Sequence, residues 1–289
     1  MRAAAVLIPV LVAFAVTVGI AARRPQMESA IRPAPRLSNV RRRTTRWRWG
    51  GVAVGVVLAV GSAASGAALG VGVMLAAPLF ALGVLAGVIV GELRVAAPIP
   101  RSASLEVRRV RDYAPRGLGV AVSAAVAGLG LVLVTTTALG SPDDLGRAGR
   151  WLVQQCGSAL TESRGPWPGS YYSLPLAILV VAGLTAATFA LQQVVQRPRQ
   201  GEDVGVDDAL RRHAVAAIVA ASGILVTVPL AGVSAIGGIA LLGISCPPWW
   251  MPVLGWTLLA LVPVAAGLAI WCTLVVAVPA RVAARRAVG

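Results

Sequence analysis

The stretch WGGVAVGVVLAVGSAASGAALGVGVMLAAPLFALGVLAGVIVG, residues 49–91, decides the fold because it holds 43 residues without a charged side chain. Arg48 directly precedes it and Glu92 directly follows it. One straight helix of that length would extend about 65 Å, whereas the hydrocarbon core of a bilayer is about 30 Å thick. We therefore expect two membrane spans, about residues 49–68 and 70–91, joined by a tight turn that lies either near residues 61–66 or at Leu69-Gly70.

The whole chain has the composition of a membrane protein. It has 289 residues, of which 57% are hydrophobic and 13% are charged, and its mean hydropathy is +0.79. Soluble domains carry about 25% charged residues. Backbone in lipid must satisfy its own hydrogen bonds, and no strand-like alternation is present, so we predict an all-α, polytopic transmembrane bundle.

Five further apolar stretches predict spans outside this hairpin, which makes about seven in all. They are residues 3–22, 117–140, 173–192, 214–234 and 253–277. The first is longer than the apolar core of a signal peptide and is followed by its arginines, although a cleaved signal remains an alternative. Between the last two, residues 234–246 either extend the sixth span or re-enter the bilayer.

The basic residues predict the orientation. The net charge is +15 and all 26 basic residues are arginines. With the N-terminus outside and the C-terminus inside, 22 of the 26 arginines fall on the cytoplasmic side, as expected for membrane proteins. The clusters adjoin apolar spans, so we do not expect a nucleic-acid partner. Arginine without lysine, beside abundant alanine, valine and glycine, indicates a GC-rich bacterial genome and hence a bacterial plasma membrane.

Arginine-rich segments between spans are predicted to contact anionic lipid headgroups, which attract basic residues at the membrane surface. Residues 23–48 are predicted to form a cytoplasmic linker of this kind. The proposed anchors are Arg41, Arg42, Arg43, Arg108, Arg109, Arg111, Arg211 and Arg212.

The segment 141–172 is predicted to be an extracytoplasmic loop. Ser141-Pro142-Asp143-Asp144 has the residues of a helix start: a capping serine, a proline and then acids. Apolar residues at helical spacing follow and predict a short amphipathic helix on the membrane. They are Leu145, Ala148, Leu152, Cys156 and Ala159.

Two cysteines fall outside in this topology. Cys156 and Cys246 lie in different outer loops, and the oxidising compartment permits a disulfide between them. The alternative is two unrelated small residues, since the sequence does not give the distance between their Cα atoms.

Glycines repeat at four-residue spacing in the second arm of the hairpin. Gly83, Gly87 and Gly91 share one helix face, and such small residues let helix backbones approach closely. We predict that they pack helices together, either within one chain or in a homodimer.

No catalytic, cofactor-binding or metal-binding motif is recognisable. Without lysine there is no Walker A loop, and one histidine, His213, excludes paired-histidine metal motifs. The spans as drawn contain no aspartate, glutamate, histidine, lysine or arginine, which argues against an ion-coupled transporter.

Two short loops resemble a known group of proteins. Arg111 to Arg116 (RDYAPR) and Val206 to Arg212 (VDDALRR) are similar to cytoplasmic loops of uncharacterised actinobacterial integral membrane proteins. The resemblance implies a polytopic membrane protein and no particular activity or site.

These features favour a non-catalytic membrane component or assembly partner, with a membrane protein or a second copy as possible partner. The alternative is a transporter or permease subunit for a neutral or apolar solute, with its cavity near residues 234–244. An enzyme acting on lipids ranks third.

Overall fold

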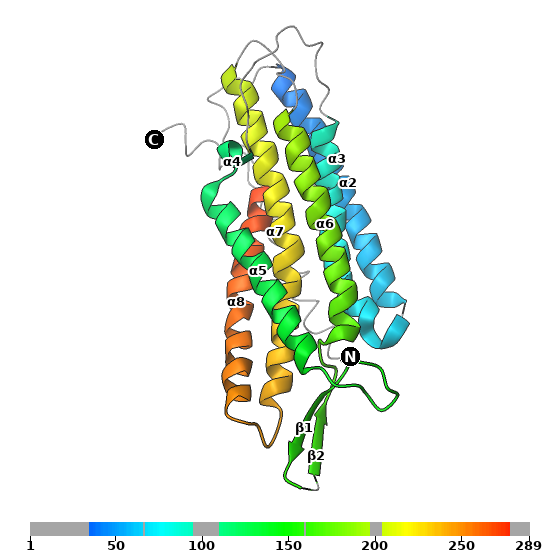
Figure 1. The fold of residues 1–289 in the computed structure, drawn as a ribbon. Helices are drawn as coiled ribbons and strands as arrows, with labels where there is room; N and C mark the ends of the chain where they lie inside the picture. The colour runs from blue at the N-terminus through cyan, green and yellow to red at the C-terminus, as the bar shows by residue number, and fades with distance from the viewer. Residues whose placement is uncertain (1–34, 66, 95–109, 159, 197–203, 278–289) are drawn as a thin grey trace.

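The computed structural model describes residues 35–65, 67–94, 110–158, 160–196 and 204–277, which form an elongated bundle of long helices with a β-hairpin at one end (Figure 1). The predicted first span, residues 3–22, lies outside this described part. In chain order the elements are α2 (Pro35–Ala64), the 3-10 turn η1 (Ala67–Gly70), α3 (Val71–Leu93), α4 (Val110–Tyr113), α5 (Arg116–Leu139), β1 (Leu152–Cys156), β2 (Leu160–Arg164), α6 (Ser170–Gln196), α7 (Val204–Leu242) and α8 (Trp250–Ala277).

The outward faces of the helices are apolar. Within the described residues, six helices are long and apolar enough to cross a membrane. Large apolar side chains are exposed on their outer surfaces, among them Val57, Val120, Leu131, Val181, Ile239 and Val264. A water-exposed protein rarely displays so continuous an apolar surface. The fold is therefore that of a multi-pass helical membrane protein.

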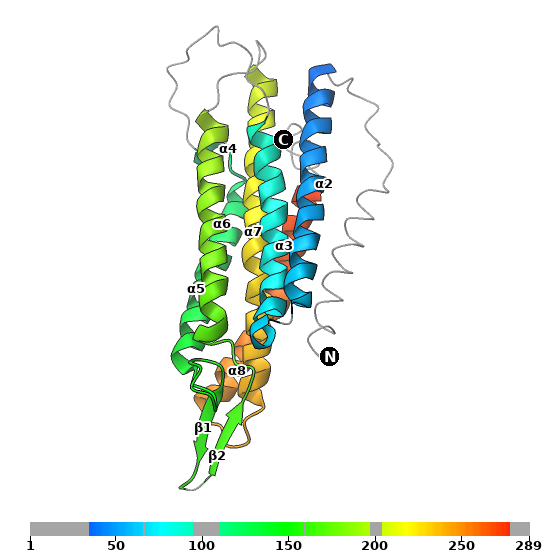
Figure 2. The same ribbon diagram turned by 90° about the vertical axis from the view of Figure 1, so that its right-hand side faces the viewer.

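The uncharged stretch folds into a helical hairpin made by α2 and α3, which lie side by side (Figure 2). The turn between them uses a positive φ of 54° at Leu69 and of 98° at Gly70. Glycine adopts this left-handed conformation at little cost, which is why the chain can reverse there. The Ser62 hydroxyl donates a hydrogen bond to the Gly72 carbonyl over 2.7 Å and closes the turn.

Close glycine contacts hold the two arms together. A Cβ atom added to Gly87 would lie 2.6 Å from the Cα of Gly51, so no larger residue fits there without movement. Gly83 also meets α2, and Gly91 faces the Cβ of Trp47. The glycine face of α3 is thus covered by α2 of the same chain.

Helix α7 is the centre of the bundle and packs against α3, α5, α6 and α8. Of the residues in the most apolar 18-residue stretch of α7, 89% are buried, compared with 17% in the corresponding stretch of α2. Many of its buried residues are small, which lets neighbours approach from every side; they include Ala214, Ala216, Ala217, Ala220 and Ala221. Residues 234–242 continue this helix, so most of the segment 234–246 extends α7 and does not turn back, and residues 243–246 belong to the α7–α8 loop.

Several helices begin earlier than their apolar stretches. Helix α2 begins at Pro35, so residues 35–48 of the predicted linker are helical, and residues 23–34 lie outside the described part. Proline is well suited to a first helical position, and arginine is a good helix former. An apolar stretch marks only the part of a helix that lipid can surround, whereas the helix itself continues into water.

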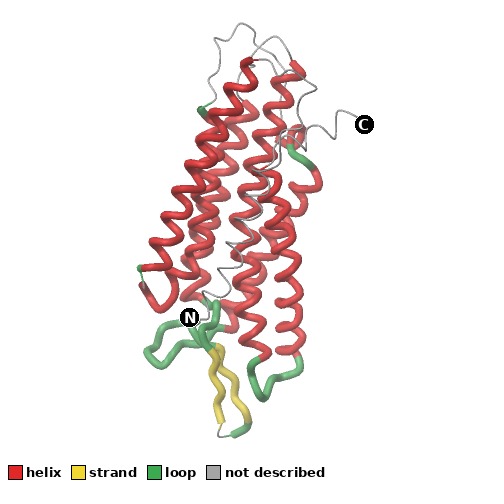
Figure 3. The backbone as a smooth tube through the Cα atoms, turned by 180° about the vertical axis from the view of Figure 1, so that it is seen from behind, coloured by secondary structure: helices red, strands yellow, loops and turns green. Residues whose placement is uncertain are grey.

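The predicted amphipathic helix in residues 141–172 is wrong. Strands β1 and β2 form an antiparallel hairpin there, so the fold is not purely α-helical (Figure 3). Gly146 and Gly149 have φ values of 75° and 73°, which an α-helix does not accommodate. Leu152 and Cys156, four residues apart, share a face in a strand as well as in a helix, which explains the misassignment.

Candidate functional site

Two polar clusters lie at opposite ends of the bundle. We call one the arginine-rich end, where α2 begins and α3 and α8 end (Figures 1 and 2). The hairpin end is the other, and it carries η1, the β-hairpin and the α7–α8 loop. Each cluster joins segments that are far apart in the sequence.

A buried arginine organises the arginine-rich end. Arg48 of α2 donates from Nη2 to the Glu92 carboxylate of α3 over 2.9 Å, and from Nη1 to the Val276 carbonyl of α8 over 3.2 Å. The side chains of Arg48 and Glu92 are only 11% and 7% exposed. An ion pair this deeply buried holds its helices together because either charge alone would be costly to bury.

His213 brings α7 into the same cluster. Its Nε2 lies 3.4 Å from Nη2 of Arg48. Because a guanidinium only donates, this nitrogen accepts the contact only when it carries no proton. The Nε of Arg48 has no hydrogen-bond partner within the described residues. One guanidinium therefore contacts α3, α7 and α8 through its two terminal nitrogens.

Arg211 does not anchor the chain to headgroups as predicted. It is completely buried, and its Nη1 donates to the carbonyls of Val194 and Val195 over 3.1 and 2.8 Å. Those carbonyls end α6 and have no partner within their own helix. A cation there also suits the negative end of the helix dipole. The neighbouring Arg212 is exposed, as an anchor requires.

Of the other predicted anchors, four lie in helices that the structure describes and two lie outside the described residues. Arg41, Arg42 and Arg43 belong to α2, with Arg43 exposed, and Arg111 belongs to α4. Arg108 and Arg109 lie outside the described residues. Additional contacts at this end link neighbouring elements: the Arg94 guanidinium lies 4.3 Å from the Trp47 ring centre, and Tyr113 donates to Asp208 over 3.3 Å.

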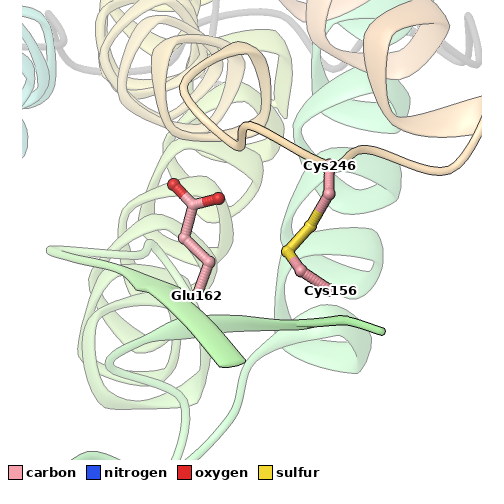
Figure 4. Close-up of side chains that lie close together, drawn as sticks. All are labelled: Cys156, Glu162 and Cys246. Carbon is pink, nitrogen blue, oxygen red and sulfur yellow. A yellow bond between two sulfur atoms is a disulfide. The ribbon is translucent and has the colours of Figure 1, made fainter. Parts of the chain in front are cut away.

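At the hairpin end a disulfide joins Cys156 of β1 to Cys246 of the α7–α8 loop, with a Cα–Cα distance of 5.7 Å (Figure 4). Glu162 of β2 lies beside it and accepts hydrogen bonds from the Ser245 amide over 2.7 Å and from Arg164 over 3.1 Å. The Ser245 amide, followed by the positive charge of Arg164, lowers the pKa of Glu162 below its usual value.

These three side chains also resemble a metal-ligand set, since the two sulfurs and a Glu162 oxygen lie within 4.8 Å of one another. Metals bind cysteine as the thiolate, and sulfurs bonded to each other supply none. One carboxylate then remains, and it is already hydrogen-bonded. The oxidised cluster is therefore a covalent link rather than a metal centre.

A second acid organises the loop beside the hairpin. Asp143 accepts hydrogen bonds from the Leu145 and Arg147 amides, and its side chain pairs with Arg147 and Arg150 over 2.7 and 2.6 Å. Burial alone would raise the pKa of Asp143, but the hydrogen bonds from Arg147 and Arg150 outweigh it and lower the pKa to about 2. The residues that were predicted to begin a helix, 141–144, therefore lead into a turn whose backbone amides are bonded by the Asp143 carboxylate.

Two aromatic residues at this end, Trp167 after β2 and Tyr172 of α6, bond to the ends of other helices. Trp167 is fully buried, and its Nε1 donates to the Thr136 carbonyl over 2.7 Å. Tyr172 donates to the Leu69 carbonyl over 3.0 Å and so reaches the α2–α3 turn. A groove of about 100 Å³ opens next to Trp167 between α5 and α8, and its walls are almost entirely apolar.

The sequence interpretation missed the Arg48–Glu92 pair, treating both residues only as the flanks of an uncharged stretch. A signal was present: both residues are equally far along the chain from Gly70, so an antiparallel hairpin that turns there brings them together. The burial of Arg211 had no comparable signal, because it depends on where α6 ends in space.

No protein-family model matches the chain, and comparison with the curated proteins and with the solved structures found no match.

Proposed function

We propose that this chain is a non-catalytic component of a bacterial plasma membrane that serves as a membrane subunit or assembly partner for another protein. The observation that carries the proposal is the use of its buried ionisable groups. Arg48, Glu92 and Arg211 all join helices to one another. Groups committed to holding a bundle together are not available to carry a substrate.

The central position of α7 supports this proposal over a permease. A permease needs a path along the bundle axis, where transported solutes bind near the bilayer midplane. Helix α7 occupies that axis with small, buried residues. The apolar groove beside Trp167 opens at the hairpin end, between α5 and α8.

We propose seven spans, with residues 3–22 as the first, an outer N-terminus and an inner C-terminus. The distribution of arginines supports this orientation, with 22 of 26 assigned to the cytoplasmic side. A disulfide at the hairpin end agrees with an oxidising outer compartment. We also propose that the chain is related to the uncharacterised actinobacterial membrane proteins that two of its loops resemble.

Exposed arginines at the arginine-rich end are then available for anionic headgroups of the inner leaflet. They are Arg43, Arg46, Arg94, Arg116 and Arg212. Each basic residue near such a surface contributes about 1 kcal/mol at physiological salt. This electrostatic attraction to the headgroups orients the bundle in the membrane and does not select a protein partner.

Co-purification tests the proposed function. The chain, tagged after Gly289 and expressed at its native level, is solubilised from its own membrane beside an equally tagged, unrelated membrane protein. We expect one protein to accompany it in a fixed stoichiometry and to be absent from the control. Recovery of the chain alone from several mild detergents would contradict an assembly role.

A reporter that fluoresces only in the cytoplasm, fused after Gly289, tests the orientation separately. We expect a fluorescent fusion. A silent fusion that is nevertheless inserted in the membrane would reverse the proposed topology and leave the co-purification result untouched.

A further inference from the structure

The two bonded cysteines come from elements that do not adjoin in the chain. Cys156 ends β1, whereas Cys246 lies in the α7–α8 loop, 90 residues further on. A disulfide forms only when the two Cα atoms are within about 7 Å and the side chains face each other. Some contact must therefore hold the loop against the hairpin in the right register.

Glu162 lies on the correct face of the hairpin for this task. In the antiparallel register Gln154 pairs with Glu162 and Cys156 pairs with Leu160. Because alternate residues of a strand share a face, these four side chains lie on the same side of the hairpin. That side also carries the disulfide, and the Glu162 carboxylate lies next to it (Figure 4).

The carboxylate holds the residue that directly precedes Cys246. One oxygen accepts the Ser245 amide hydrogen over 2.7 Å, and the other lies 3.4 Å from the Ser245 hydroxyl. Arg164, also on this face, donates to Glu162 over 3.1 Å and fixes the carboxylate in place. The loop backbone is thus fixed one residue before Cys246.

From this geometry we infer that Glu162 is the positioning residue for the Cys156–Cys246 disulfide: its hydrogen bonds to Ser245 dock the loop so that the two thiols meet. Glu162 exchanges no proton or electron in the reaction. With glutathione disulfide as oxidant, the Cys156–Cys246 sulfur–sulfur bond forms and the sulfur–sulfur bond of glutathione disulfide breaks. The two protein thiols are oxidised, and their two electrons and two protons pass to glutathione disulfide, which leaves as two glutathione thiols.

The reduced full-length protein in detergent, equilibrated with glutathione redox buffers at neutral pH, tests this. Trapping the free thiols and counting them by mass gives the effective concentration of one thiol at the other. We expect Glu162→Ala to lower it about tenfold, which corresponds to about 30 mV for this two-electron couple. Glu162→Gln should lower it less, since its amide oxygen still accepts from Ser245.

The matched control is Gln154→Ala. Gln154 lies opposite Glu162 on the same face, but its side-chain amide donates to the Gln155 carbonyl within its own strand. We expect this variant to keep the wild-type effective concentration. An equal loss in Gln154→Ala and Glu162→Ala would show a general weakening of the hairpin and overturn the inference.

Hydrogen exchange of the reduced protein provides a second readout. We expect the Ser245 amide to exchange slowly in the wild type and in Gln154→Ala, and rapidly in Glu162→Ala. If Glu162→Ala keeps both the wild-type thiol equilibrium and slow exchange at Ser245, then Glu162 does not position the loop. Both measurements use purified protein, so they do not depend on the proposed orientation or partner.

Discussion

At each end of this bundle, segments that are far apart in the sequence are held together, but the two ends use different chemistry. At the arginine-rich end the buried Arg48–Glu92 pair joins α2 to α3, and the same guanidinium reaches α8 through the Val276 carbonyl and α7 through His213. At the hairpin end a disulfide and the hydrogen bond from the Ser245 amide to Glu162 join the β-hairpin to the α7–α8 loop. Asp143 holds the adjoining loop together through backbone amides and two arginines. The buried pair is shielded from water, whereas the disulfide does not depend on burial.

This difference predicts how each end responds to perturbation. Removing one member of a buried ion pair leaves an uncompensated charge, so a single change has a large effect. The Glu162–Arg164 pair beside the disulfide is more exposed, with side chains that are 19% and 49% accessible, and such a pair contributes little by itself. The covalent link compensates for that weakness. The arginine-rich end should therefore depend on a single residue, and the hairpin end on the redox state.

The largest expected effect comes from breaking the buried pair. Glu92→Gln leaves the charge of Arg48 without its partner, and we expect the free energy of unfolding in mixed micelles to fall by about 3–5 kcal/mol. The exposed Arg212→Gln at the same end should change it by less than about 0.5 kcal/mol.

Replacing both members of that pair sharpens this prediction. Arg48→Met combined with Glu92→Leu should regain most of the lost stability, because no buried charge remains. If Glu92→Gln unfolds like the wild type, the pair does not hold this end together.

The next largest effect is loss of the disulfide at the hairpin end. Cys156→Ser should lower the free energy of unfolding by about 2–4 kcal/mol, because the unfolded chain is no longer constrained. Reducing the wild-type protein should cause the same loss, whereas reducing Cys156→Ser should cause none. Equal stability of the oxidised and reduced wild type would mean that the covalent link does not stabilise this end.

A smaller effect is expected between the two ends, where α2 and α3 meet. A Cβ at Gly87 would lie 2.6 Å from backbone atoms of Gly51 and Trp47, so Gly87→Ala should push the helices apart. We expect a loss of about 1–3 kcal/mol in the free energy of unfolding. Gly130→Ala is the control, because nothing lies within 4 Å of its added Cβ. A loss in Gly130→Ala as large as in Gly87→Ala would contradict this explanation.

The smallest effect is local and depends on pH. The pKa of Asp143 is lowered to about 2 in the folded chain, below its ordinary value of 3.8. Its contribution to stability is therefore complete above pH 3.8 and is lost as the pH falls through about 2. The protection of the Arg147 amide from hydrogen exchange, relative to the intrinsic rate at each pH, should fall over that interval in the wild type and stay constant in Asp143→Asn. An identical pH profile for the two proteins would exclude Asp143 as the cause.

The sequence allowed the helical hairpin to be predicted because length without charge is a direct measure of what lipid can surround. It failed in residues 141–172, where Leu152 and Cys156 satisfy the periodicity of a helix and of a strand equally. Gly146 and Gly149 were the available correction, since two glycines in one short segment favour turns. The helical start of α2 at Pro35 was missed because arginines outside lipid give no apolar signal.

The polar contacts were harder to predict than the helices. Arg211 and Arg212 are adjacent and identical, yet one is buried against α6 and the other is exposed. Nothing in their local sequence separates them. Only the position of the last turn of α6 decides which of the two meets unpaired carbonyls.

The sequence by itself determined which parts of this protein suit lipid: apolar stretches that are uncharged and as long as a membrane is thick are expected to form helices there. Tertiary structure alone decided that Arg48 meets Glu92, that Glu162 reaches Ser245 and that Arg211 closes α6. The physical reason is that transfer to lipid is a sum over single residues, whereas an ion pair or hydrogen bond depends on a distance between two groups. That distance exists only after the helices have packed.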